Sequence, residues 1–132
     1  LWGVALRMIE KRPLFGYGID NYRLIYGHWL DATEWNQTIH TNNWYLEMLV
    51  SVGLIGSLPF FIWLGLLITD NARTIWKRGD VWQTAIAAGI FTFIVHGVLD
   101  FFLLFTATGL LFWLLVGLWM ATKNESFIDM VQ

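Results

Sequence analysis

The sequence has no cysteine in its 132 residues, and charged residues are scarce. Without cysteine the chain can form no disulfide, bind no metal through thiolates and use no cysteine nucleophile. Only 14% of the residues are charged, whereas soluble domains carry about 25%. The net charge of -2 and the absence of any run rich in Lys or Arg offer no track for a phosphate backbone, so we expect no nucleic-acid partner.

Apolar residues make up 57% of the chain and lie in long blocks. Residues 48–69 contain no charged side chain, and a helix of this length crosses a hydrocarbon core of about 30 Å at about 1.5 Å per residue. Residues 82–120 are too many for one span and suit two, with a break near 105–109. The sequence therefore predicts an all-α membrane protein with three transmembrane helices, at 48–69, 83–104 and 107–121.

Small residues and a proline stand out in the first predicted span. Gly53, Gly56 and Ser57 have the small-residue spacing that lets helices approach closely. Pro59 predicts a kink. We therefore expect a bent helix that packs tightly against a neighbour.

Residues 1–47 form a polar, aromatic-rich arm before this span. The pattern of residues 1–11 predicts a short amphipathic helix, which Arg12-Pro13 ends because proline disfavours a helical residue before it. The apolar face of this helix consists of Trp2, Ala5, Leu6 and Ile9. Residues 13–22 are rich in turn-forming residues, and residues 26–39 are predicted to form an aromatic loop.

The positive charges near the predicted spans indicate the orientation. A loop at 70–82 and a tail at 122–132 share one side and carry Arg73, Lys77, Arg78 and Lys123. Such charges favour the cytoplasm, so we expect the arm on the extracytoplasmic side of the cytoplasmic (inner) membrane. Because the chain begins with Leu1 and has no signal-peptide pattern, we expect a fragment of a larger multi-pass protein in the lipid bilayer.

The most informative polar residues come just before the first span. If the helix starts at Thr41 or Asn42, both good N-caps, then Asn43 and Glu47 share one face because they are four residues apart. His40 would lie at the helix start, where a histidine suits proton transfer because its unperturbed pKa is about 6.5. The alternative is an interfacial histidine held by hydrogen bonds of the loop.

His96 and Asp100 form a second pair, four residues apart within an apolar block. Ionisable residues inside a membrane are costly and usually face a partner or a wet cavity. The expected topology places both toward the outer end of their span, on the same side as His40. They could serve the site or form a polar clasp between helices, and the spacing leaves both open. These three residues are too dispersed to predict a metal site, so we expect no metal or other cofactor.

Four basic residues of the arm could bind an anionic substrate: Arg7, Lys11, Arg12 and Arg23. Arginine is especially suited to bidentate contact with phosphate. Arg12 is the preferred candidate because the turn that follows fixes its backbone, whereas Arg7 and Lys11 are typical of a solvated helix face.

Three motifs, in this order, resemble those of the O-antigen ligase and polymerase family. Residues 12–18 (RPLFGYG) with the Asn-Tyr pair at 21–22 resemble the first motif. Residues 40–47, followed by GLIG at 53–56, resemble the second, and His-Gly-x-x-Asp at 96–100 resembles the third. The resemblance covers about the whole chain and corresponds to the C-terminal part of these proteins.

This resemblance implies a metal-independent inner-membrane glycosyltransferase with many helices. Such enzymes move a glycan from a polyprenyl-diphosphate donor to a lipid, a growing polysaccharide or a protein on the outer side of the membrane. In this chain His40 would be the catalytic base. The residues expected to bind substrate or support the base are Arg12, Asn21, Asn43, Glu47, His96 and Asp100. One position departs from the pattern: many relatives have a further histidine where this chain has Thr38.

Two alternatives come from other functional classes. A transporter of a small anion such as inorganic carbon would use His96 and Asp100 as part of an ion path through the membrane. An interaction module of a membrane complex would need no chemistry. The polar residues of the arm favour the transferase, because a transporter usually gathers such residues near the membrane midplane.

Overall fold

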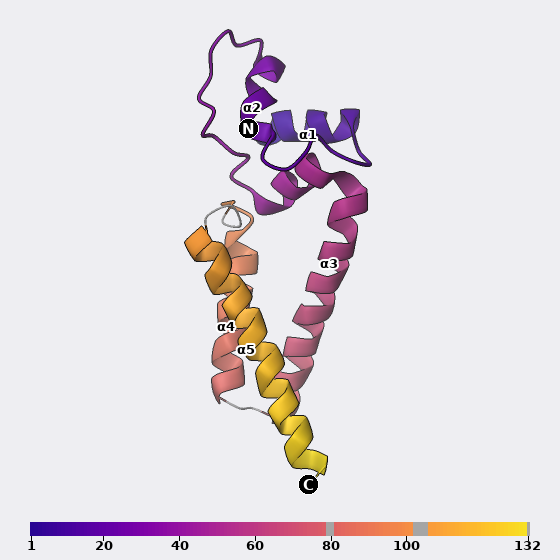
Figure 1. Cartoon of the computed structure of the whole chain (residues 1–132), viewed down its shortest axis with the longest axis vertical. Coiled ribbons are helices and arrows are strands. Elements are labelled where there is room, and N and C mark those ends of the chain that lie inside the picture. Colours follow the sequence, from indigo (N-terminus) through magenta and orange to yellow (C-terminus); the bar gives the residue numbers. More distant parts are fainter. Residues whose placement is uncertain (79–80, 102–105, 132) are drawn as a thin grey trace.

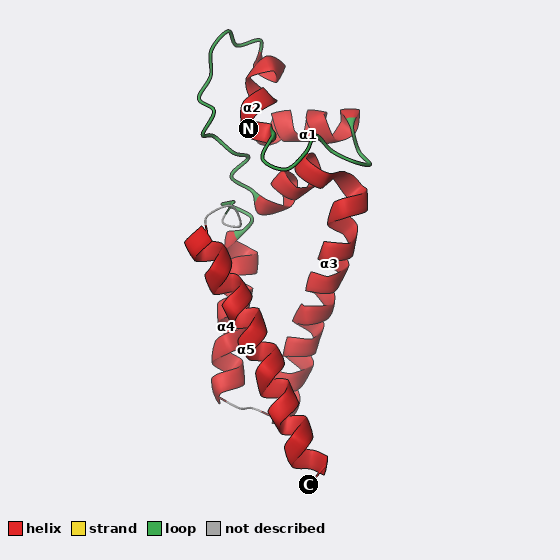
Figure 2. Cartoon of the chain, in the orientation of Figure 1, coloured by secondary structure: helices red, strands yellow, loops and turns green. Residues whose placement is uncertain are grey.

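Every regular element in the described part of the chain is a helix, as predicted (Figure 2). The computed structural model describes the backbone of residues 1–78, 81–101 and 106–131, and their side chains except at 78, 106 and 123–131. The elements in chain order are α1 (Trp2–Lys11), α2 (Tyr22–Ile25), the 3₁₀ helix η1 (Tyr26–Leu30), α3 (Trp44–Arg78), α4 (Val81–His96) and α5 (Thr106–Val131).

The arm, which holds α1, α2 and η1, lies at one end of three long helices (Figure 1). From the arm, α3 leads away, α4 returns and α5 leads away again, so the C-terminus lies at the opposite end. α4 contacts both α3 and α5, and α1 lies across the beginning of α3. This path brings the residues after α4 back to the arm.

α3 is longer than the predicted span at both ends. It begins at Trp44 and continues to Arg78, so most of the loop predicted at 70–82 is helical instead. Residues 70–78 include no glycine or proline that would stop the helix, and charge alone does not end one.

The other two predicted spans also have different ends. α4 ends at His96 rather than near residue 104, because Gly97 follows and glycine is a poor helix former. α5 begins at Thr106, and it extends through the predicted tail as far as Val131. Of the break predicted at 105–109, residues 106–109 are helical in α5. Residue 105 and the predicted end of the second span at 102–104 lie outside the described residues.

One helix in the described part of the chain, Trp44–Lys77, is long and apolar enough to cross a membrane by length and composition. α4 and the apolar part of α5, Ala107–Thr122, are shorter than the usual span of about 20 residues. The first predicted span is therefore found as a long apolar helix. The other two spans, and insertion into a membrane, stay predictions.

α3 is interrupted at Gly53, whose φ of 64° and ψ of -170° are not helical. We expected the kink at Pro59, which lies within the helix after the interruption. A Cβ atom at position 53 would collide with the backbone of Leu14, because the loop that follows α1 passes directly against α3. The positive φ and this close approach both require glycine.

The loop at 13–18 fills the interruption of α3 with four backbone hydrogen bonds. Written from donor to acceptor, they are Tyr17 to Val50, Gly18 to Ser51, Leu54 to Pro13 and Ile55 to Leu14, at 2.8, 2.8, 2.8 and 3.1 Å. A break in a helix deprives such groups of their partners, and each one left buried and unpaired costs about 1–3 kcal/mol. We call this arrangement the loop–helix interlock. It joins the first two sequence motifs in one structural unit.

α1 is amphipathic as predicted, but the face that it buries only overlaps the predicted one. Ala5 is buried and Ile9 packs against the same apolar cluster, as predicted. Trp2 and Leu6, also expected on the apolar face, are exposed, and Val4 and Met8 are buried in their place. The buried residues form one apolar cluster with Tyr22, Tyr26 and Val50. The face that α1 buries is therefore the one that meets α2, η1 and the beginning of α3.

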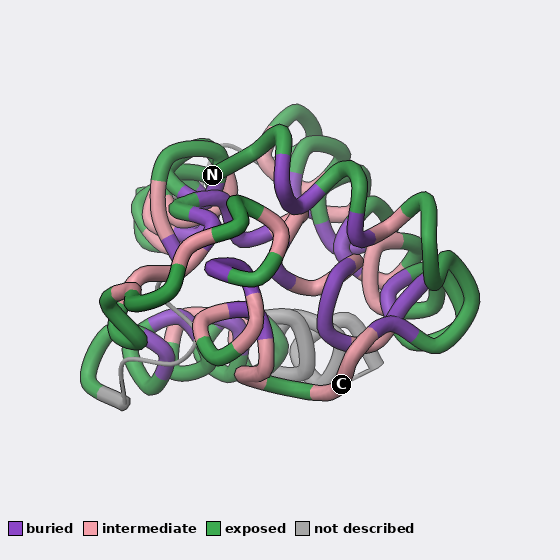
Figure 3. Tube along the Cα trace, turned by 90° about the horizontal axis from the view of Figure 1, so that it is seen from above, coloured by how far each residue is buried: buried purple, intermediate pink, exposed green. Residues whose placement is uncertain are grey.

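A second apolar cluster joins the three long helices. It includes Trp44 from the start of α3, Ile90 from α4, and Phe112 and Trp119 from α5, all at most 1% exposed. Seen down the long axis of the molecule, buried segments turn toward neighbouring elements and exposed segments lie on the outside (Figure 3). The helices therefore hold together through a narrow seam and leave much apolar surface uncovered.

We predict that Gly53→Ala destabilises the fold. Alanine at a positive φ costs about 1–2 kcal/mol, and the collision with the Leu14 backbone adds to this cost. Thermal unfolding in detergent should show a melting temperature several degrees below that of the wild type.

Gly65→Ala is the matched control, because Gly65 lies in the same helix with open space around its Cβ position. It should be neutral or stabilising by up to about 1 kcal/mol. Equal melting temperatures for the two variants would contradict the proposed need for glycine at the interlock.

Candidate functional site

Glu47 lies in the first turn of α3 and is fully buried. Its Oε2 accepts a hydrogen bond from the Thr41 backbone N–H at 2.9 Å, and its Oε1 lies 3.3 Å from Nδ1 of His40. A buried carboxylate is tolerated only with such partners. The chain between residues 40 and 47 therefore folds back so that its own loop solvates the carboxylate.

The start of α3 is fixed by Asn43 and by the end of α4. The Asn43 side chain accepts from the Leu46 N–H at 2.9 Å, as an N-cap does, and donates to the Val98 carbonyl at 3.0 Å. The Trp44 N–H donates to the Gly97 carbonyl at 2.7 Å. Asn43, expected to support catalysis or bind substrate, thus caps the helix and ties it to the turn after α4.

The helix starts later than the sequence suggested. We expected Thr41 or Asn42 as the N-cap, but Asn42 has a left-handed backbone with φ of 51° and cannot begin a helix. Thr41 is buried, and its hydroxyl donates to the Asn43 carbonyl at 2.8 Å. Even so, His40 and Glu47, which the resemblance expects to act together, lie in contact.

His40 is partly buried between the arm and the turn after α4. Its ring lies 5.2 Å, centre to centre, from the ring of Phe101. Its Nδ1 faces Glu47, and its Nε2 lies 3.9 Å from Oδ1 of Asp20. If Nδ1 carries the proton, donating it to Glu47, then Nε2 has a free lone pair and can accept a proton. The expectation that loop hydrogen bonds hold His40 and the expectation that it acts as a base are thus compatible.

Asp20 and Arg23 form a bidentate ion pair beside His40. Nε and Nη2 of Arg23 donate to Oδ1 and Oδ2 of Asp20, both at 2.7 Å, and Nη1 donates to the Gln37 carbonyl at 3.0 Å. This geometry is the strongest kind of carboxylate pairing. Asp20 therefore bridges the guanidinium of Arg23 and the imidazole of His40.

Hydrogen bonds from Arg23 hold the pKa of Asp20 below its usual value, and the same bonds raise the pKa of Arg23. Because the folded-state pKa of Asp20 is the lower one, the pair stabilises the fold above the pKa of an unfolded aspartate, about 3.9. That stabilisation is lost as the pH falls through the folded-state pKa. At neutral pH the carboxylate is ionised.

Arg12 and Asn21, both expected to bind substrate, contact Tyr17. The Arg12 guanidinium lies over the Tyr17 ring at 4.8 Å from its centre, and the Asn21 amide donates to the Tyr17 carbonyl at 2.7 Å. Arg12 is exposed. These two residues brace the loop of the interlock, and it is Arg23 that reaches the His40 neighbourhood.

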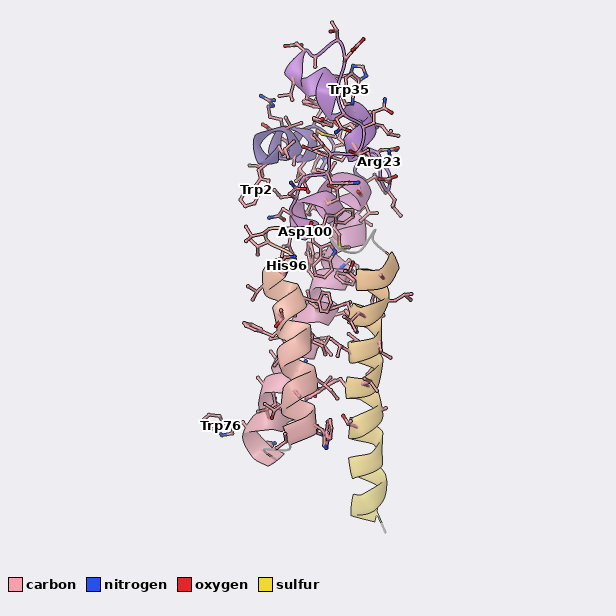
Figure 4. The ribbon with its side chains drawn as sticks, turned by 90° about the vertical axis from the view of Figure 1, so that its left-hand side faces the viewer. Trp2, Arg23, Trp35, Trp76, His96 and Asp100 are labelled. Atoms are coloured by element: carbon pink, nitrogen blue, oxygen red, sulfur yellow. The ribbon has the colours of Figure 1, made fainter. Side chains whose placement is uncertain are left out.

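His96 and Asp100 lie side by side where the arm meets the long helices (Figure 4). Nε2 of His96 is 3.3 Å from Oδ2 of Asp100, so the predicted pairing is confirmed. The two side chains are 56% and 45% exposed, and because His96 is the last residue of α4, Asp100 lies beyond the helix. The Asp100 carbonyl also accepts from the Trp44 N–H at 3.1 Å, which fits the polar-clasp alternative.

Neither Asp20 nor Tyr22 was among the predicted site residues, although Tyr22 belongs to the Asn-Tyr pair of the first motif. Asp20 could have been found from its i, i+3 spacing to Arg23, a spacing at which opposite charges pair on helices. Tyr22 is buried, and its hydroxyl donates to the Leu1 carbonyl at 3.0 Å. Burial, and next the charge of Glu47, raise the pKa of Tyr22. The motif contains this residue, but no local spacing indicates that it is buried.

Two cavities lie along the long helices. One, of about 470 Å³, lies between α3 and α5 and is lined by residues that include Trp63, Asp70, Arg73 and Trp119. The other, of about 340 Å³, lies between α3 and α4 and is almost wholly apolar. His40 lines neither. No group of three or more His, Asp or Glu side chains within the described ranges is placed to hold a metal ion.

No protein-family model, curated protein or solved structure matches this chain. The geometry of the site therefore has to carry the functional interpretation.

We predict that Glu47→Gln loosens the hold on His40. An amide replaces the charged acceptor, and the change from charged to neutral hydrogen bonds should cost about 1 kcal/mol of unfolding free energy. The ¹⁵N shifts of the His40 ring should also move toward a mixture of tautomers, which NMR of labelled histidine detects.

Glu34→Gln is the control, because Glu34 is exposed in the arm. It should leave both readouts within experimental error. If Glu47→Gln had wild-type stability and unchanged His40 shifts, Glu47 would not be the residue that orients His40.

Proposed function

We propose that this chain forms part of a membrane glycosyltransferase. It would move a glycan from a polyprenyl-diphosphate donor to a hydroxyl of a lipid, polysaccharide or protein acceptor in cell-surface polysaccharide assembly, such as that of O-antigen. The pair of His40 with the buried Glu47 is the observation that carries this proposal. The ordered resemblance of the three motifs to the O-antigen ligase and polymerase family supports it.

The exposed apolar surface supports the membrane part of the proposal. Side chains exposed on the long helices include Leu58, Ile62, Leu66, Phe91, Leu110 and Leu114. Soluble proteins rarely expose such continuous apolar surface, so lipid or further helices would cover it. Trp76, 92% exposed, points away from the helices at the end opposite the arm (Figure 4), as an aromatic residue at a membrane interface does.

His40 is suited to be a general base. Glu47 at Nδ1 would stabilise the imidazolium that forms when Nε2 takes the proton of an acceptor hydroxyl. The acceptor oxygen then bonds to the anomeric carbon of the glycan. The bond from that carbon to the diphosphate breaks, and polyprenyl diphosphate leaves with the electron pair.

Negative charge that develops on the leaving diphosphate needs a fixed cation, and Arg23 is the best placed guanidinium in the described residues. It is joined to the His40 neighbourhood through Asp20. Arginine matches phosphate oxygens bidentately and can stabilise them without a metal. Arg12, preferred from the sequence, has less support because it lies over Tyr17.

The transporter alternative has less support. Its candidate residues lie at the arm end of α4 and are about half exposed: His96 is the last residue of the helix, and Asp100 lies beyond it. A transport path would be expected to place ionisable residues near the middle of the long helices.

The experiment that tests the proposal is His40→Ala in the full-length protein, expressed in cells that lack their own copy. Loss of a general base typically lowers the rate by about 10²–10⁴-fold. Surface glycan on a gel should therefore disappear while the amount of protein in the membrane stays normal.

His28→Ala is the matched control, since His28 is an exposed histidine of the same arm whose ring packs on Trp35. It should leave the glycan pattern intact. Normal surface glycan in the His40→Ala strain would remove His40 from the mechanism and with it the main support for a transferase.

A further inference from the structure

We propose that Asp20 is a built-in competitor of the anionic substrate: in the empty site its carboxylate occupies the face of Arg23 that binds phosphate oxygens, and it yields that face when a diphosphate enters. This inference rests on the proposed function, which supplies the diphosphate. It adds a residue that sets the affinity for the donor.

The Asp20 carboxylate binds Arg23 with the geometry that a phosphate group would use. Nε and Nη2 of Arg23 point in parallel at the two carboxylate oxygens of Asp20, both at 2.7 Å. This is the fork by which arginine also binds two oxygens of a phosphate group. A diphosphate can therefore bind this edge of Arg23 bidentately only if Asp20 leaves it.

The third nitrogen of Arg23 stays anchored during such an exchange. Nη1 donates to the Gln37 carbonyl at 3.0 Å, and the Arg23 carbonyl accepts from Nε1 of Trp35 at 3.2 Å. Both partners belong to the loop at 31–39, which contributes no carboxylate to the fork. The guanidinium can thus keep its place while the anion on its other edge is replaced.

The backbone of Asp20 holds the carboxylate in this position. Asp20 has a left-handed conformation with φ of 65°, one of three non-glycine residues with positive φ in the described chain. Such a conformation is unfavourable for most side chains and tends to be kept at functional positions. Asp20 lies two residues after the loop at 13–18, which the interlock holds in place, so the backbone that carries the carboxylate is fixed.

Besides Arg23, Asp20 has a second neighbour that can carry a positive charge, His40. Its Oδ1 lies 3.9 Å from Nε2 of His40, the nitrogen that would take the acceptor proton. The ion pair is accessible, with about a third of each side chain exposed. Displaced from Arg23, the carboxylate would remain near His40, where it favours the protonated imidazole that forms during transfer.

Binding of inorganic pyrophosphate to the full-length protein in detergent, measured by titration calorimetry, tests this inference without any glycan transfer. Asp20→Asn removes the competing charge, and asparagine adopts a left-handed backbone as readily as aspartate. The pyrophosphate dissociation constant should fall roughly two- to fivefold, the range expected for an accessible ion pair. Asp20→Gly, which also permits a positive φ, should give the same gain.

Asp31→Asn is the matched control, because Asp31 has φ of 53°, is exposed, and loses the same charge. It should leave the dissociation constant unchanged. Arg23→Gln added to Asp20→Asn should remove the gain, since the fork itself is then lost. Unchanged or weaker pyrophosphate binding by Asp20→Asn, or no binding by any variant, would overturn the inference.

The two proposals fail in different ways. If Asp20→Asn binds pyrophosphate more tightly but the wild type transfers no glycan, Asp20 still guards an anion site and the transferase proposal falls. If glycan transfer is normal but pyrophosphate binding does not respond to Asp20→Asn, the transferase stands and the role of Asp20 is wrong.

Discussion

Four backbone hydrogen bonds between the loop at 13–18 and the interruption of α3 hold the arm against the long helices. Gly53 leaves carbonyl and N–H groups of α3 without helical partners, and the loop supplies them. Asp20 follows this loop directly, and Glu47 precedes the interruption in the same helix. The interlock therefore sets the distance between the Asp20–Arg23 pair and the His40–Glu47 pair of the candidate site.

A buried carboxylate sets the second constraint. Glu47 can stay buried only because Thr41 and His40 turn their polar groups toward it, which forces the chain before α3 to fold back. Asn43 and the Gly97 carbonyl then satisfy the first N–H groups of the helix. The third motif thus meets the second through the backbone, and His40 lies where all three parts of the chain converge.

The structure divides the residues in and around the motifs into two groups: those that set the backbone geometry and those proposed to carry out the chemistry. The glycine-rich first motif serves the backbone geometry of the interlock, and Arg12 and Asn21 brace that loop through Tyr17. The proposed function assigns the chemistry to His40 with Glu47 on one side and to Arg23 with Asp20 on the other. The proposed function rests on the first pair, and Arg23, which reaches His40 through Asp20, would supply the cation that the leaving diphosphate needs.

The sequence by itself determined the helical class, the long apolar helix, amphipathic α1 and the pairing of His96 with Asp100. The long helix follows from the uncharged apolar run at 48–69, and the other two features follow from residues three or four positions apart. That Glu47 supports His40 was expected only from the resemblance of the second motif, whereas the structure shows the two side chains in contact. Only the tertiary structure decided which face of α1 is buried, that Gly53 rather than Pro59 interrupts α3, and that Asp20 lies beside His40. These features join residues about 20 to 40 positions apart, and such contacts arise from packing and from unpaired backbone groups that no local pattern records.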